Sequence, residues 1–244
     1  MKFFSKQPDP VKDPPQVAAA LQRQLRDNLQ SLVIYGSAVR GGFNPKKSDI
    51  NLMLILKDAN MSALLAISKV LSGFAKVNPM IIDAGSLPRD LQVFRLKFSS
   101  IQRHYQVLAG CDPFSGGTAS LPDRFQIEQA LRNLQLRLAR QIVLQADQTE
   151  KLNQLLVNQA SGLMTEVSYI PRLAGCDIAN SFLDRLPQLE KYFGLSLPNL
   201  ALLLKIQSES GQLNSSQCFM VFEEVKNLLK RALEMIATET MAGH

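Results

Sequence analysis

The sequence has few of the residues that several common kinds of site require. Its three cysteines, Cys111, Cys176 and Cys218, are far apart and odd in number. Their spacing matches neither a structural zinc site nor a disulfide framework. We therefore expect a chain that folds in a reducing, cytoplasmic compartment.

Histidine is nearly absent, with His104 inside the chain and His244 at its C-terminal end. A helical ribonuclease with an R-x4-6-H motif needs a histidine on an internal helix, and no predicted internal helix carries one. The sequence gives equally poor support for a Ser-His-Asp hydrolase. The sequence also lacks G-x-x-x-x-G-K-[ST], so the motif of a P-loop enzyme is missing.

Long apolar runs are missing as well. No stretch approaches the roughly 20 residues of a membrane-spanning helix, and residues 1–5 hold no apolar segment of signal-peptide length. We expect no membrane partner.

Glutamate is absent from residues 1–117, which carry 15 Lys and Arg against 8 Asp, a net charge of +7. The remaining 127 residues carry 12 Lys and Arg against 13 Asp and Glu, a net charge of −1. A basic first half suits a polyanion, either a triphosphate or nucleic acid. The alternative is scattered, solvated lysines.

Apolar residues in the first half form short runs separated by turn residues. Residues 1–14 contain several prolines and are predicted to be a flexible tail. The patterns that follow predict helices and strands in the order of a small mixed sheet with flanking helices. The predicted strands are 32–35, 50–56, 77–82 and 103–108, and the predicted helices are 16–29, 61–75 and 87–94.

The pattern changes near Gly116 and Gly117. After them, leucine and isoleucine recur at helical spacing in several stripes, which predicts a helical bundle. The expected fold class is α+β, with a small mixed-sheet domain over residues 15–115 and an all-α bundle over residues 118–240.

The most informative stretch runs from Leu32 to Leu56 and reads L-V-I-Y-G-S-A-V-R-G-G-F-N-P-K-K-S-D-I-N-L-M-L-I-L. Two apolar runs flank a basic loop. At its start, Gly36 and Ser37 can offer backbone N–H groups and a hydroxyl to a phosphate. Asp49 and Asn51 alternate where the second run begins, so they share one face of the predicted strand.

These residues resemble the nucleotidyltransferase signature of the polymerase-beta-like superfamily: an apolar strand, G-S, a loop, then D-x-D or D-x-E. The form S-D-I-N-L, together with V-F-R-L-K-F and V-L-A-G-C-D-P-F between Val93 and Phe114, is similar to an uncharacterised bacterial group within it. The similarity covers about residues 15–145. It implies that Asp49 binds Mg²⁺ on a nucleoside triphosphate, ATP before others, and that Gly36 and Ser37 contact its phosphates.

The departure from that signature is Asn51, where the superfamily has a carboxylate. An amide oxygen can coordinate a metal but brings no negative charge, and a two-metal site needs anionic ligands. Asn51 is therefore either a weak ligand or the mark of an inactive site. Asp83, the acidic residue at the third strand, is the candidate third ligand, with an ordinary surface position as the alternative.

Other basic residues carry weaker expectations. The loop residues Arg40, Lys46 and Lys47 either contact phosphate or form a solvated loop. Lys97 stands where the similar group tends to have an acid, and either pairs with phosphate or lies on the surface.

Two functions stay open. The first is a nucleotidyltransferase that moves a nucleoside monophosphate to an unknown small-molecule, protein or nucleic-acid acceptor. The second is a catalytically inactive protein of the same fold that binds nucleotide or a protein partner. A homodimer through the helical domain is a further expectation.

Overall fold

The computed structural model of the chain describes residues 14–40, 49–74, 76–117, 121–209 and 211–241. The chain divides into two compact units, Met1–Ser120 and Leu121–His244, which we call the first and second units. The predicted tail, apart from Pro14, lies outside the described residues. None of the described helices is long and apolar enough to cross a membrane.

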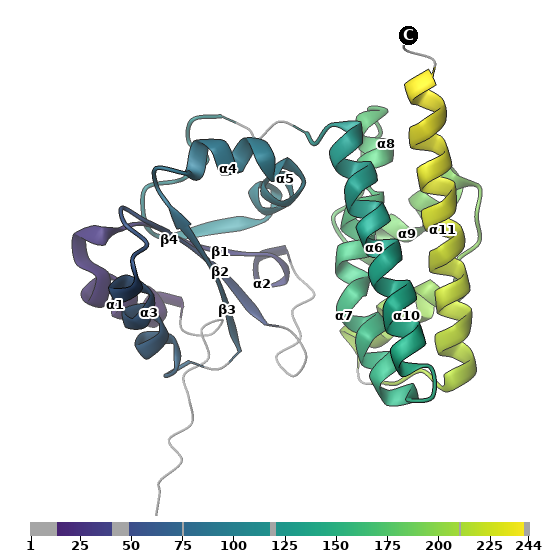
Figure 1. Cartoon of the computed structure of the whole chain (residues 1–244), viewed down its shortest axis with the longest axis horizontal. Coiled ribbons are helices and arrows are strands. Elements are labelled where there is room, and N and C mark those ends of the chain that lie inside the picture. Colours follow the sequence, from purple (N-terminus) through teal and green to yellow (C-terminus); the bar gives the residue numbers. More distant parts are fainter. Residues whose placement is uncertain (1–13, 41–48, 75, 118–120, 210, 242–244) are drawn as a thin grey trace, which may run out of the picture. The chain divides into compact units, whose positions relative to one another are not determined.

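The first unit is built on a mixed sheet of four strands in the order β3-β2-β1-β4 (Figure 1). β1 runs antiparallel to β2 and β4, while β2 runs parallel to β3. The elements of this unit are α1 (Pro14–Leu25), the 3-10 helix η1 (Arg26–Asn28), β1 (Leu29–Tyr35), α2 (Ser37–Arg40), β2 (Ile50–Leu56), α3 (Met61–Leu71), β3 (Val77–Asp83), α4 (Leu87–Val93), α5 (Arg95–Arg103) and β4 (Tyr105–Gly110).

The two central strands are apolar almost throughout because both faces of the sheet are covered. On one face, alternate residues such as Leu52 and Leu54 pack with α1 and α3. On the other, Met53 and Ile55 pack with Phe98 of α5. The edge strand β3 contains Pro79, which cannot donate to a neighbouring strand and suits an edge.

The stretch V-L-A-G-C-D-P-F closes this second face and has a structural role. Gly110 has φ +77°, and a Cβ there would lie 2.0 Å from the carbonyl oxygen of Gln30. Both oxygens of Asp112 accept from the Tyr105 hydroxyl, at 3.1 and 2.9 Å, and one also accepts from the Phe114 N–H at 2.9 Å. Burial, followed by this hydrogen bond, raises the pKa of Tyr105. Phe114 is thereby held in the core beneath the sheet.

Every regular element described in the second unit is a helix, which confirms the predicted fold class. Asp123 begins the first of them with a capping box shared with Gln126. The helices are α6 (Arg124–Gln145), α7 (Thr149–Val167), α8 (Tyr169–Leu173), α9 (Phe182–Phe193), α10 (Pro198–Ser208) and α11 (Ser215–Met241).

Candidate functional site

Most of the candidate residues that the structure describes lie at one end of the sheet: Gly36, Ser37 and Arg40 follow β1 there, and Asp49 and Asn51 lie where β2 begins. Across the four strands, Asn78, Asn51, Tyr35 and Tyr105 occupy paired positions. By alternation they lie on the face covered by α5, because Met53, Met80 and Val107 beside them pack there. The candidate site is therefore a row of polar side chains at one end of an apolar sheet face. We call this end of the sheet, together with the adjoining residues Gly36, Ser37, Arg40 and Asp49, the margin.

Gly36 turns the chain out of β1 beside Asn51. Its φ is +84°, and a Cβ there would lie 3.2 Å from Nδ2 of Asn51. Its N–H donates to the carbonyl of His104 at 3.1 Å, and its carbonyl accepts from Val39 and Arg40. The backbone N–H of Gly36 is thus used by the fold, and a ligand at this turn would have to be bound by donors of the residues that follow, beginning with Ser37.

Arg40 ends the short helix α2 that Ser37 begins. It is half-buried, and burial lowers the pKa of its guanidinium, which remains a cation at neutral pH. Lys46 and Lys47, also predicted to contact phosphate, lie outside the described residues.

Asn51 is paired with a residue that the sequence did not single out. Nδ2 of Asn78 donates to Oδ1 of Asn51 at 3.1 Å across the parallel strands β2 and β3. Asn51 is half-buried and Asn78 is exposed. Two neutral amides thus stand side by side next to the Gly36 turn.

Asp49 is exposed and lies immediately before β2. It precedes Asn51 by two residues, which places it at the same margin of the sheet. The N–H of Ile50, between them, donates to the Lys76 carbonyl at 2.7 Å, so the start of β2 is tied to the start of β3.

The structure does not bring Asp83 to this margin. It pairs with Leu56 at the opposite end of β2, five residues from the Asn51–Asn78 pair, which is about 16 Å along a strand. Its two oxygens accept from the N–H groups of Ala59, at 3.3 Å, and Gly85, at 2.9 Å. Asp83 shapes a turn there and cannot share an ion with Asp49.

The oxygen atoms that the described residues of the margin could offer to a metal ion do not fit a two-ion magnesium centre. Such a centre needs several anionic oxygens, whereas the described residues offer Asp49 and a pair of amides bonded to each other. Across the part of the chain that the structure describes, no three His, Cys, Asp or Glu side chains gather where they could hold a metal ion.

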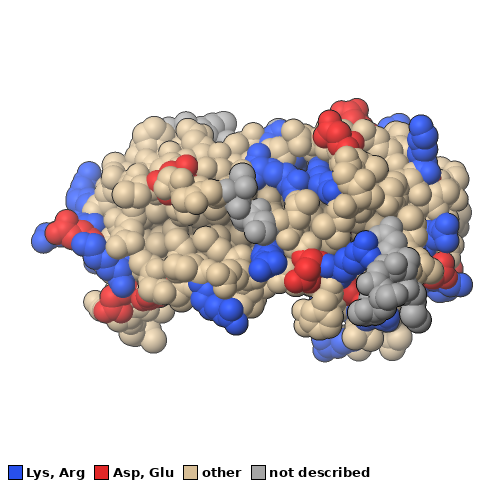
Figure 2. All heavy atoms as spheres, turned by 90° about the horizontal axis from the view of Figure 1, so that it is seen from above, with Lys and Arg blue, Asp and Glu red and all other residues tan. Residues whose placement is uncertain are grey.

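Cations outnumber carboxylates among the described residues near this end. Arg40 ends α2, Lys76 directly precedes β3, and Arg103 ends α5 next to His104, whose carbonyl binds Gly36. Two carboxylates stand against them: Asp49, directly before β2, and Asp112, which accepts from the Tyr105 hydroxyl. Lys97 is exposed and lies near the start of α5, two turns before Arg103. On the face drawn in Figure 2, Lys and Arg lie in several small groups and not in one continuous patch.

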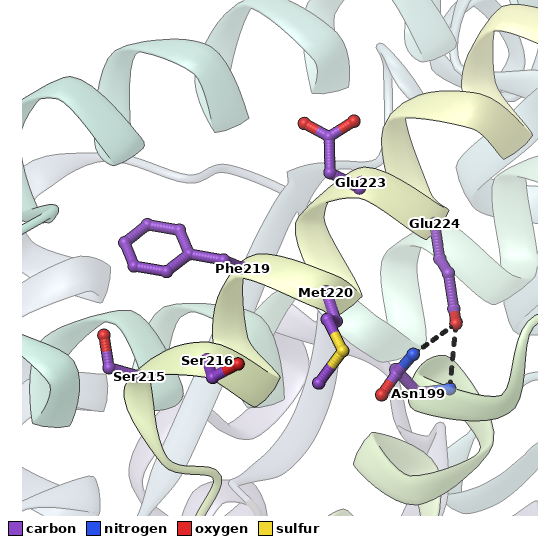
Figure 3. Close-up of a pocket in the computed structure, with 7 residues that line it drawn as sticks. All are labelled: Asn199, Ser215, Ser216, Phe219, Met220, Glu223 and Glu224. Carbon is purple, nitrogen blue, oxygen red and sulfur yellow. Dashed lines mark hydrogen bonds between the residues drawn. The ribbon is translucent and has the colours of Figure 1, made fainter.

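The second unit contains an open cavity of about 580 Å³. Figure 3 shows Phe219 and Met220 projecting from α11 beside Glu223 and Glu224. Glu224 is committed to the fold, because its oxygens accept from the backbone N–H groups of Asn199 and Leu200 and from Nδ2 of Asn199, at 2.6 to 3.0 Å. The remaining residues that line this cavity are Ser215 and Ser216.

No protein-family model and no curated protein matches the sequence of this chain. Solved structures do match. One is the crystal structure of spectinomycin adenyltransferase AAD(9) from Enterococcus faecialis with ATP and spectinomycin. The TM-score is 0.60 at 12% sequence identity, over 91% of this chain and 98% of that one. The chain therefore has the fold of a nucleotidyltransferase, with a small mixed sheet followed by a helical region.

Proposed function

We propose that this chain binds a nucleoside triphosphate at the margin formed by Gly36, Ser37, Arg40, Asp49 and Asn51, and that it transfers nucleotide poorly or not at all. The observation that carries this proposal is the Asn51–Asn78 amide pair, which occupies the place beside Asp49 where a charged ligand set would be needed. Fold alone does not set activity, because activity depends on the side chains of the site.

Each residue of the margin has a role in binding. Gly36 keeps space open beside Asn51, since a side chain there would crowd its amide. Ser37 donates from its hydroxyl and N–H to phosphate oxygens. Arg40 supplies a half-buried cation, which interacts more strongly with phosphate than a fully solvated one does.

Transfer to a small-molecule acceptor is the second candidate function. It is favoured by the fold that the chain shares with an adenyltransferase whose structure contains ATP and spectinomycin. In this case Asp49 alone, among the described residues of the margin, would have to provide the anionic ligand for the metal ion.

The experiment is a calorimetric titration of the full chain with ATP, alongside an assay for pyrophosphate release. Binding without pyrophosphate release is the expected result. The variant Ser37→Ala with Arg40→Ala should weaken binding at least tenfold, because it removes one hydroxyl donor and one charge-assisted contact, each of about 1–2 kcal/mol.

The matched control is Ser62→Ala with Arg89→Ala. Both residues are exposed. They lie on α3 and α4, which come after β2 and β3 at the end of the sheet away from the margin. This variant should bind ATP as the wild type does. Equal weakening in both double variants would move the site elsewhere, and pyrophosphate release by the wild type would favour transfer.

A further inference from the structure

We infer that the triphosphate site takes the metal-free nucleotide and that Mg²⁺ opposes binding. The inference rests on the proposed function and concerns the ionic form of the ligand. It follows because a magnesium centre requires several anionic oxygen ligands, and the described residues of the margin offer mainly neutral amides and cations.

The first argument is charge. Three cations, Arg40, Lys76 and Arg103, stand next to the margin in the chain, against two carboxylates, Asp49 before β2 and Asp112, which accepts from the Tyr105 hydroxyl. Chelation by Mg²⁺ neutralises about half of the negative charge of a nucleoside triphosphate, since the ion binds directly to its phosphate oxygens. A margin with an excess of cations attracts the metal-free polyanion more strongly than its magnesium complex.

The second argument is the chemistry of the amide pair. Each asparagine amide has two N–H donors. The bond from Asn78 Nδ2 to Asn51 Oδ1 uses one donor of Asn78, and Nδ2 of Asn51 lies close to the Gly36 turn. Amide N–H groups can donate to bare phosphate oxygens, whereas carboxylates at these two positions would repel them.

The same bond works against the ion. A hydrogen-bonded amide oxygen is a poorer ligand for Mg²⁺, which binds through carboxylates and phosphates and gives up its waters reluctantly. Asn51 and Asn78 together therefore set the preference for metal-free nucleotide.

The test is to titrate the full chain with ATP in excess EDTA and again in excess MgCl₂, at matched ionic strength. Tighter binding in EDTA, on the order of tenfold, is expected for the loss of about two charges from the ligand in the magnesium titration. Equal affinity in the two buffers, or tighter binding with Mg²⁺, would overturn the inference and leave the proposed function intact. An absence of binding in both buffers would overturn the proposed function itself.

A double variant tests the roles of the two amides. Asn51→Asp with Asn78→Asp should weaken ATP binding in EDTA and strengthen it in MgCl₂. ATP should then bind more tightly with Mg²⁺ than without it, the reverse of the wild-type order of affinities. The control is Asn133→Asp with Asn158→Asp, which adds the same charge at exposed positions of the second unit and should keep the wild-type order. Retention of the wild-type order in the Asn51 and Asn78 variant would show that these amides do not set the preference.

Discussion

At the scale of single residues, the close approach of Gly36 to Asn51 determines what the site can be. Gly36 combines a positive φ with a neighbouring amide 3.2 Å from where its Cβ would lie. Both features restrict this position to glycine. Backbone geometry thus explains the glycine of the Gly-Ser pair, which leaves room for the Asn51 amide and whose N–H donates to the His104 carbonyl.

The first prediction is that Gly36→Ala destabilises the first unit by about 1–2 kcal/mol, the usual cost of a left-handed conformation for a residue with a Cβ. It should also weaken ATP binding, because the new methyl group displaces the Asn51 amide. Urea denaturation and calorimetry measure the two effects.

Its control is Gly175→Ala. Gly175 has a similar φ of +80°, but a Cβ there would meet nothing within 4 Å. It should show a comparable strain and unchanged ATP binding. Wild-type affinity in Gly36→Ala would contradict the place given to Asn51 at the site.

The candidate residues show where sequence reasoning succeeded and where it could not. The apolar run that begins at Ile50 was enough to predict that Asp49 and Asn51 lie at the start of one strand. The amide of Asn78 and the distant position of Asp83 depend on β3 running parallel to β2. The strand-helix-strand order over residues 50–83 favours a parallel pair, and this signal could have found Asn78.

At the scale of helices and strands, the short apolar runs that form the central strands were predictable, whereas the amphipathic helix α5 was not. Its sequence contributes only Phe98, Ser99 and Ile101 to buried positions, too few for a clear helical stripe. Its packing against Met53 and Ile55 of β2 arises from tertiary structure. The strands β1 and β2 have no such ambiguity because both of their faces are buried.

The second prediction concerns the start of α10. Glu224 of α11 accepts hydrogen bonds from the first free N–H groups of α10, which belong to Asn199 (Figure 3) and Leu200. Glu224→Ala should therefore destabilise the second unit by about 1–2 kcal/mol, as the loss of a helix cap does.

The neighbouring Glu223→Ala is the control. Its carboxylate is exposed and pairs with Lys226 one turn further along α11. Such surface pairs contribute little, so the change should stay within about 0.5 kcal/mol of wild type. Equal losses in the two variants, measured by urea denaturation, would show that Glu224 does not cap α10.

The third prediction is a pH dependence from α7. Burial raises the pKa of Glu166 to about 7, partly opposed by Arg137 of α6. Its Oε2 is buried, and no described residue donates a hydrogen bond to it. The folded state thus holds the proton more tightly than the unfolded state, so the contribution to stability is complete below about pH 4.5 and is lost as the pH rises through 7.

Glu166→Gln cannot ionise and should remove this dependence. It should match wild type near pH 4 and exceed it by up to about 3 kcal/mol at pH 8, as measured by urea denaturation. Glu150→Gln, at an exposed position on the same helix, should keep the wild-type pH profile. A pH profile of Glu166→Gln identical to that of wild type would contradict this account.

At the scale of the whole molecule, the fold is that of a nucleotidyltransferase, and the site that we propose lacks, among the described residues, the anionic ligands of a two-ion magnesium centre. Hydrophobic periodicity was enough to predict a small mixed sheet followed by helices, because short apolar runs mark the strands of the first half and helical stripes continue through the second. The chemistry depends on few residues brought together by strand register, and the pair Asn51 and Asn78 is one such case.

The central claim is that nucleotide binds at the margin of the sheet in the first unit. The most direct measurement is hydrogen–deuterium exchange of the full chain with and without saturating ATP in EDTA. The account predicts slower exchange at the end of β1, along α2 and at the start of β2, with no change around the cavity between Asn199 and Glu224. Protection confined to that cavity, with unchanged exchange from Tyr35 to Arg40, would contradict it.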